Sequence, residues 1–125
     1  MLLNYVLVFV GGGLGAAARY WLQGLVYAET GTSFPYGTLV VNILGCFLIG
    51  FLMSSMEERF LVNPPIRIFL TIGFLGGFTT FSSFSFETMS LFRDGEALYA
   101  FANAFGSLFL CLVCTWLGIQ LGKLV

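Results

Sequence analysis

Polar residues inside an otherwise apolar segment are the first candidates for chemistry in this chain. Residues 73–86 read GFLGGFTTFSSFSF, so that paired glycines and a row of hydroxyls interrupt a stretch long enough to span a membrane. A helix broken there frees carbonyl and N–H groups at membrane depth, and such breaks often build ion sites. Gly76, Gly77, Thr79 and Thr80 are therefore the site candidates. The alternative is a continuous helix whose Ser and Thr hydroxyls bond back to preceding carbonyls.

Phenylalanine recurs every three residues from position 78 to position 84 of the same segment. Aromatic packing is the default interpretation. However, a phenyl ring has a positive edge, so Phe81 and Phe84 could line a path for an anion without trapping it. Thr79, Ser82 and Ser83 share another side of the segment, and their hydroxyls can donate hydrogen bonds to an anion stripped of water.

Two other apolar segments carry polar side chains that need partners in hydrocarbon. Asn42 follows Thr38 by one helical turn. Its amide either bonds to a neighbouring helix or donates its N–H to a permeating anion. Near the end of the chain, polar side chains recur every four residues and form a stripe suited to a path for water or ions: Asn103, Ser107, Cys111 and Thr115.

Two charges lie within the apolar segments, where ionised groups are costly and are functional candidates. Arg19 either reaches a vestibule, where it attracts anions, or anchors its own helix. Glu87 lies near the end of its segment. For this carboxylate, capping or pairing with an arginine is an alternative to a role in transport.

The composition indicates a membrane protein. The 125 residues are 58% hydrophobic and only 9% charged, against about 25% charged in an ordinary soluble domain. A formal net charge of -1 gives no basic field for nucleic acid, and the absence of histidine removes Ser-His-Asp and Cys-His catalysis. We therefore expect neither an enzyme nor a nucleic-acid-binding protein.

Three cysteines lie in apolar stretches and are interpreted as packing residues: Cys46, Cys111 and Cys114.

Four apolar segments are each long enough to cross about 30 Å of hydrocarbon as a helix. Short polar loops separate them, and Pro64-Pro65 fixes the entry to the third. The sequence predicts an all-α membrane protein, one domain over residues 1–125, with a broken third helix. The expected spans are 2–26, 37–56, 66–92 and 97–122.

Glycines spaced by four residues predict close helix packing, since they let two backbones approach: 11 and 15, 73 and 77, 118 and 122.

The basic residues give only a weak bias for the orientation of the chain in the membrane. The side with both termini carries Arg59, Arg67 and Lys123, against one or two on the other, namely Arg93 alone or Arg93 with Arg19. Insertion in both directions is therefore a hypothesis, and it would permit an antiparallel homodimer.

Residues 37–45 (GTLVVNILG) and 73–88 (GFLGGFTTFSSFSFET) together resemble the Fluc/CrcB family of fluoride channels. The resemblance extends over essentially the whole chain. It includes the early Arg19 after a glycine-rich run, the PYGT entry at 35–38 and the TWLG ending at 115–118.

This resemblance implies a dual-topology antiparallel homodimer that exports fluoride passively across the bacterial inner membrane through two pores and so confers fluoride resistance. By analogy, three residues would contact fluoride: Asn42, Phe81 and Phe84. Ser82 and Ser83 would belong to the nearby hydroxyl cluster. The carbonyls of Gly76 and Thr79, from both subunits, would hold a structural Na⁺.

The fourth helix only partly follows the hydroxyl-rich track expected from the resemblance. Ser107 and Thr115 match that track, whereas Asn103 and Cys111 depart from it.

Two other functions remain as alternatives. A proton-coupled small multidrug transporter shares four short helices but needs a mid-membrane carboxylate, and a structural membrane subunit needs only the glycine packing.

Overall fold

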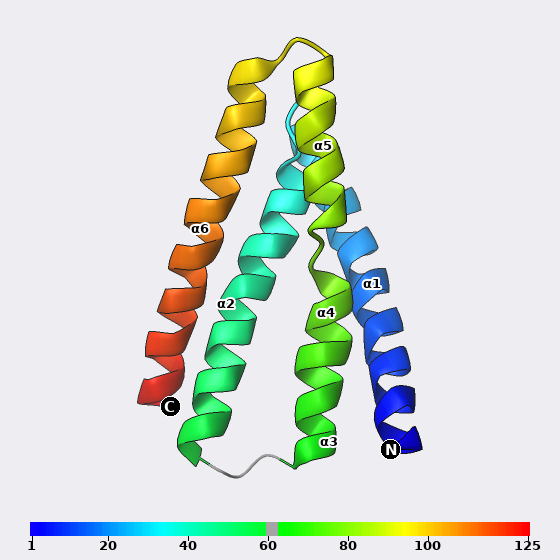
Figure 1. The fold of residues 1–125 in the computed structure, drawn as a ribbon, viewed down its shortest axis with the longest axis vertical. Helices are drawn as coiled ribbons and strands as arrows, with labels where there is room; N and C mark the ends of the chain where they lie inside the picture. Colours follow the sequence, from blue (N-terminus) through cyan, green and yellow to red (C-terminus); the bar gives the residue numbers. More distant parts are fainter. Residues whose placement is uncertain (60–62) are drawn as a thin grey trace.

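The computed structural model describes residues 1–59 and 63–125, which form helices joined by short connections (Figure 1). The part of the chain so described contains no strand, which confirms an all-α fold. In chain order the helices are α1 (Leu2–Thr30), α2 (Tyr36–Arg59), α3 (Pro64–Arg67), the π-helix η1 (Ile68–Leu75), α4 (Gly76–Phe78), α5 (Ser82–Arg93) and α6 (Ala97–Leu124).

Four helical segments are long and apolar enough to cross a membrane: Leu2–Thr30, Tyr36–Glu57, Pro64–Arg93 and Ala97–Leu124. This confirms the four predicted spans. The third span combines α3, η1, α4 and α5. Both chain termini, the end of α2 and the start of α3 lie at one end of the molecule (Figure 1). The arrangement is that of a multi-pass membrane protein.

Several details of the spans differ from the prediction, and α1 runs to Thr30, four residues beyond its expected end. Residues 57–59 were expected in a loop, but α2 continues to Arg59. Charged side chains at the end of a span reach the interface without ending the helix. The π-helix η1 was not expected at all, because an apolar run has the same composition whether its bonds run from i to i+4 or to i+5. The third span begins at Pro64, two residues before the expected start at 66, with Pro64 and Pro65 in its first turn.

Glycines bring α1 against the third span. A Cβ added to Gly11 would lie 2.7 Å from the carbonyl oxygen of Phe69, and one added to Gly73 would lie 3.1 Å from the Gly11 Cα. A Cβ on Gly77 would collide with the carbonyl of Gly12. The predicted role of the glycine pairs in close packing is confirmed for this crossing.

A second close crossing joins α2 and α6, which run in the same direction (Figure 1). A Cβ on Gly118 would collide with the carbonyl oxygen of Phe47. Farther along the two helices, the Ser54 hydroxyl donates to the carbonyl of Ile119 at 3.1 Å. The crossing is therefore fixed both by small residues and by an interhelical hydrogen bond.

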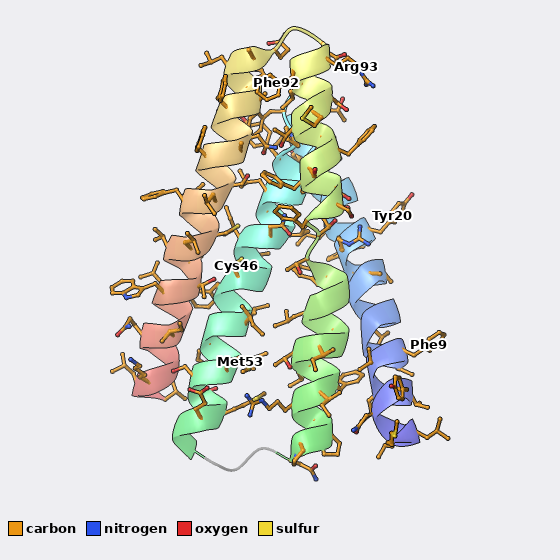
Figure 2. The ribbon with its side chains drawn as sticks, in the orientation of Figure 1. Phe9, Tyr20, Cys46, Met53, Phe92 and Arg93 are labelled. Carbon is orange, nitrogen blue, oxygen red and sulfur yellow. The ribbon has the colours of Figure 1, made fainter. Side chains whose placement is uncertain are left out.

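Few large side chains are enclosed within the single chain. Val41 and Ala100 are fully buried, whereas Phe9 and Tyr20 are each 81% exposed. Figure 2 shows Phe9 and Tyr20 pointing away from the other helices. Outward apolar side chains over this much of the surface would be unfavourable in water, so lipid or another protein surface must cover them.

Candidate functional site

The third span is broken at the position that the glycine and threonine pattern predicts. Helix α4 ends at Phe78, and α5 begins at Ser82. Between them Thr79 is extended, with φ -91 and ψ 160, and its hydroxyl donates to the Leu75 carbonyl at 3.0 Å. The alternative of a continuous helix is therefore wrong. The Leu75 carbonyl also accepts the Thr79 N–H at 3.1 Å, so both donors of Thr79 bond back to the end of the helix.

Asn42 of α2 holds the broken segment in place. Its Nδ2 donates to the Thr80 carbonyl at 2.9 Å, and its Oδ1 accepts from the Thr80 N–H at 2.8 Å. One side-chain amide thus hydrogen-bonds to both the carbonyl and the N–H of the same residue. Since an amide nitrogen carries two hydrogens, one N–H of Asn42 is left over from this pairing.

The break redirects two backbone donors. In a continuous helix the Thr80 N–H would bond to the Gly76 carbonyl, but here it bonds to Asn42. Likewise the Ser83 N–H, which would bond to the Thr79 carbonyl, donates to the Thr80 hydroxyl at 3.1 Å. The carbonyls released by this redirection belong to Gly76 and Thr79, the two residues named for the cation.

Arg19 of α1 contacts the same region. Its Nε donates to the carbonyl oxygen of Gly77 at 3.0 Å. A cation at the carboxyl end of a helical segment interacts favourably with the carbonyls exposed there. Of the two roles that the sequence left open for Arg19, this contact supports anchoring, although the side chain also brings a positive charge to the break.

A cavity of about 530 Å³ lies beside the break, between residues of α2, α5 and α6. Its described lining contains amide, hydroxyl and thiol groups among apolar side chains, and no charged residue. The lining residues are Asn42, Cys46, Thr79, Thr80, Phe81, Phe84, Ala104, Phe105, Ser107, Leu108 and Cys111. The cavity therefore brings together four residues named for the pore: Asn42, Phe81, Phe84 and Ser107.

The two phenylalanines of the cavity wall form a pair. The ring centroids of Phe81 and Phe84 are 5.5 Å apart, with the rings tilted by 50°. Phe84 is half-buried, whereas Phe81 is 80% exposed on the single chain. The rings are in contact, so no ion fits between them, but the tilt directs their edges differently and a small ion beside the pair can meet a positive ring edge.

Ser82 and Ser83 lie at the start of α5 and are not among the cavity-lining residues. The Ser82 hydroxyl shares a hydrogen bond of 3.3 Å with the Thr80 hydroxyl. In α6, the Thr115 hydroxyl donates to the carbonyl of Cys111 at 3.0 Å, and Thr115 also lies outside the lining. These three residues lie near the break or farther along the stripe, and their contact with an ion stays a prediction.

The buried part of the α6 stripe is tied to α5. Asn103 donates from Nδ2 to the Thr88 hydroxyl at 2.8 Å, and the Ser107 hydroxyl donates to the Asn103 Oδ1 at 3.2 Å. Thr88 in turn donates to the carbonyl of Phe84 at 2.8 Å. The sequence predicted the stripe but not this chain of bonds, which links Ser107 at the cavity to the backbone of Phe84.

The surroundings of Glu87 were not predictable from the sequence. The Thr38 hydroxyl donates to Glu87 Oε1 at 2.6 Å, and the Tyr27 hydroxyl donates to Oε2 at 3.3 Å. Gln23 donates to the Thr38 hydroxyl at 3.2 Å. Hydroxyls therefore contact this carboxylate, in place of the arginine that one interpretation expected. The only available signal was the spacing of Thr38 and Asn42, which lie one helical turn apart in an apolar segment. This spacing does not identify Glu87 as the partner of Thr38.

Comparison with known proteins agrees with this architecture. The family described as CrcB-like protein, Camphor Resistance (CrcB), matches residues 6–119. A protein of Geobacter sp. (strain M21) is 54% identical over 112 residues, covering 90% of each chain. One from Geotalea uraniireducens (strain Rf4) is 55% identical over 119 residues, covering 95% of this chain and 94% of the relative. Both relatives are named fluoride-specific ion channel FluC.

Proposed function

The chain belongs to the CrcB-like protein family, and on that premise we propose that it is a fluoride-selective passive ion channel. It acts in the bacterial inner membrane, where export of fluoride relieves fluoride toxicity. The names of the relatives identify fluoride as the ion, and the cavity beside the helix break is large enough to hold it.

The observation that carries this proposal is the neutral lining of that cavity. Asn42, Ser107 and the ring pair Phe81–Phe84 combine an amide, a hydroxyl and ring edges around one space. Such groups can replace the water of a small, strongly hydrated anion. Because no fixed positive charge lines the space, an ion that enters is not trapped and can leave again.

The ion route extends from the cavity along hydroxyls on both sides. Ser82 and Ser83 form the hydroxyl cluster near the break, while Thr115 continues the α6 track beyond Ser107. Arg19, named for a vestibule from the sequence, bonds to the Gly77 carbonyl at the break, and the positive charge that it brings there attracts anions toward the cavity. An inside-negative potential drives an anion outward by about 2.3 kcal/mol per 100 mV, so no chemical energy source is needed.

The working unit is a homodimer of two antiparallel copies with two pores. Two features of the single chain support this assembly. Phe81 belongs to the cavity wall and yet is 80% exposed, so the wall lacks a cover on that side. The basic residues are also divided weakly between the two ends of the molecule, which allows insertion in both directions.

A structural Na⁺ at the centre of the dimer fits the donor set at the break. Gly76 and Thr79 have carbonyls whose usual helical donors are taken by Asn42 and by the Thr80 hydroxyl. Unwound carbonyls of this kind coordinate Na⁺ in broken membrane helices. The carbonyls of Gly76 and Thr79 would hold the cation, which would supply a positive charge to balance their partial negative charges. Replacing Na⁺ by N-methyl-D-glucamine in every buffer should lower the unfolding temperature, and an unchanged temperature would argue against the cation.

The alternatives are less well supported. A proton-coupled transporter needs a carboxylate that exchanges protons with its cargo, whereas Glu87 is held by Thr38 and Tyr27. A purely structural subunit does not account for amide, hydroxyl and ring groups meeting at one cavity.

Growth of a fluoride-sensitive bacterium that lacks its own fluoride exporter tests the function in cells. Expression of this protein should restore growth in fluoride, and Phe84→Ile should abolish the rescue because a ring edge is removed from the cavity. Phe9→Ile is the matched control, since Phe9 points away from the other helices (Figure 2). Equal rescue by Phe84→Ile and the unaltered chain would exclude the ring pair from the ion route.

A further inference from the structure

Two cysteines from different helices meet at the wall of the cavity. Cys46 of α2 and Cys111 of α6 both line it, so both thiols reach the same space. Both are free and half-buried. Figure 2 labels Cys46 about halfway along α2.

The register between the two helices places the two cysteines at one level. The hydrogen bond from Ser54 to Ile119 joins residues 65 positions apart, and Cys46 and Cys111 have the same separation. Since α2 and α6 run in the same direction, equal separations mark neighbouring levels of one crossing. Cys114, the remaining cysteine, also lies on α6 but is not among the residues that line the cavity.

Two facing thiols suit a particular class of ligand. Thiolates are soft ligands and select soft metal ions such as Cu⁺. The described residues contain no group of three or more His, Cys, Asp or Glu that could hold a metal ion, so a four-coordinate zinc site has no ligand set. Ions that accept two thiolates in a line, namely Hg²⁺, Ag⁺ and Cu⁺, need only a pair.

We propose that Cys46 and Cys111 form a two-thiolate site for a soft metal ion, and that its occupation blocks the cavity. With Hg²⁺ the metal forms two S–Hg bonds, and the two thiol protons pass to water, so charge balances and no atom changes oxidation state. The blocking step rests on the proposed function, whereas binding of the metal does not.

Binding is tested first, on purified full-length protein treated with mercuric chloride and then desalted. We expect one tightly held mercury per chain by elemental analysis. Cys46→Ser and Cys111→Ser should each lower the affinity at least about tenfold, as expected for loss of a group on which a metal site depends. Cys114→Ser, the matched control, should bind as the unaltered chain does. A size-exclusion profile establishes that each variant is folded.

Three binding results would overturn the site. In the first, Cys46→Ser and Cys111→Ser both bind mercury with full affinity. In the second, only Cys114→Ser loses mercury binding. In the third, mercury binding depends on one of the cysteines alone. The last of these indicates simple attachment to one thiol.

Fluoride efflux from liposomes then tests the block. Mercuric chloride should stop efflux through the unaltered chain and through Cys114→Ser, whereas Cys46→Ser and Cys111→Ser should each keep, at the same concentration, the rate that the same variant shows before mercury is added. Mercury that binds to both thiols without slowing efflux would overturn the block. Protein that releases no fluoride before any mercury is added would instead contradict the proposed function, and the binding experiment would still decide the metal site.

Discussion

The carboxamide of Asn42 pairs with both backbone groups of Thr80, donating to the carbonyl at 2.9 Å and accepting from the N–H at 2.8 Å. A residue of α2 therefore supplies the hydrogen bonds that the third span loses at its break. Unpaired backbone groups are tolerated poorly at membrane depth. The conformation of the break thus depends on a side chain 38 positions away in the sequence.

Replacing Asn42 should weaken the break. We expect Asn42→Ala to cost about 1–3 kcal/mol of stability, because it leaves the Thr80 N–H and carbonyl without partners. It should also reduce fluoride efflux. Thermal unfolding in detergent and efflux from liposomes measure the two effects. Asn42→Asp keeps an acceptor for the Thr80 N–H but loses the donor and places an ionisable group within the span, so it should be at least as destabilising as Asn42→Ala.

Asn4→Ala is the control for this substitution, because Asn4 is an exposed amide near the start of α1. It should unfold at the same temperature as the unaltered chain. If Asn42→Ala also unfolded at that temperature, Asn42 would not hold the break.

The hydroxyl beside Glu87 gives a second prediction. Thr38→Val removes the donor that contacts Glu87 Oε1 at 2.6 Å and keeps the shape of the side chain. We expect a loss of about 1–2 kcal/mol, since hydrogen bonds to charged groups are strong in general but weaker on average between membrane helices. Glu87→Gln should lose less stability, because its amide oxygen still accepts from Thr38.

Thr30→Val makes the same chemical change at the exposed end of α1, where the hydroxyl bonds only to neighbouring carbonyls. Its unfolding temperature should barely move. A larger effect at Thr30 than at Thr38 would show that the Thr38 contact contributes little.

Two glycines of α6 should respond in opposite ways to a methyl group. In Gly118→Ala the new Cβ collides with the Phe47 carbonyl, whereas a Cβ at Gly106 meets nothing within 4 Å. Overpacking should cost Gly118→Ala about 1–3 kcal/mol. Gly106→Ala should be neutral or more stable by about 0.5–1 kcal/mol, because alanine favours helix. Thermal unfolding of both variants tests this, and equal behaviour would contradict the close crossing of α2 and α6.

Dual topology predicts that the carboxyl terminus is found on both sides of the membrane. Alkaline phosphatase is active only outside the cytoplasm and green fluorescent protein only inside, so separate carboxyl-terminal fusions should both give signal. Adding two lysines after Lys123 should bias insertion and abolish one of the signals. A single active fusion in the unaltered chain would exclude the antiparallel dimer.

Local sequence features predicted much of this fold. Long apolar runs gave the four spans, and the glycine pair with two threonines gave the position of the break. Pairings between distant residues were not predictable in the same way. Nothing around Asn42 identifies Thr80 as its partner, and the apolar sequence of η1 does not distinguish a π-helix from an α-helix. The meeting of Cys46 with Cys111 likewise depends on the register of two helices, which one sequence does not contain.

Fluoride release from liposomes containing the purified protein tests the central claim most directly. A potassium ionophore removes the opposing voltage, and a fluoride electrode follows the ion, with chloride-loaded liposomes as the control. Rapid loss of fluoride without loss of chloride is the predicted result. Folded protein that released no fluoride, or released chloride equally fast, would contradict a selective passive channel.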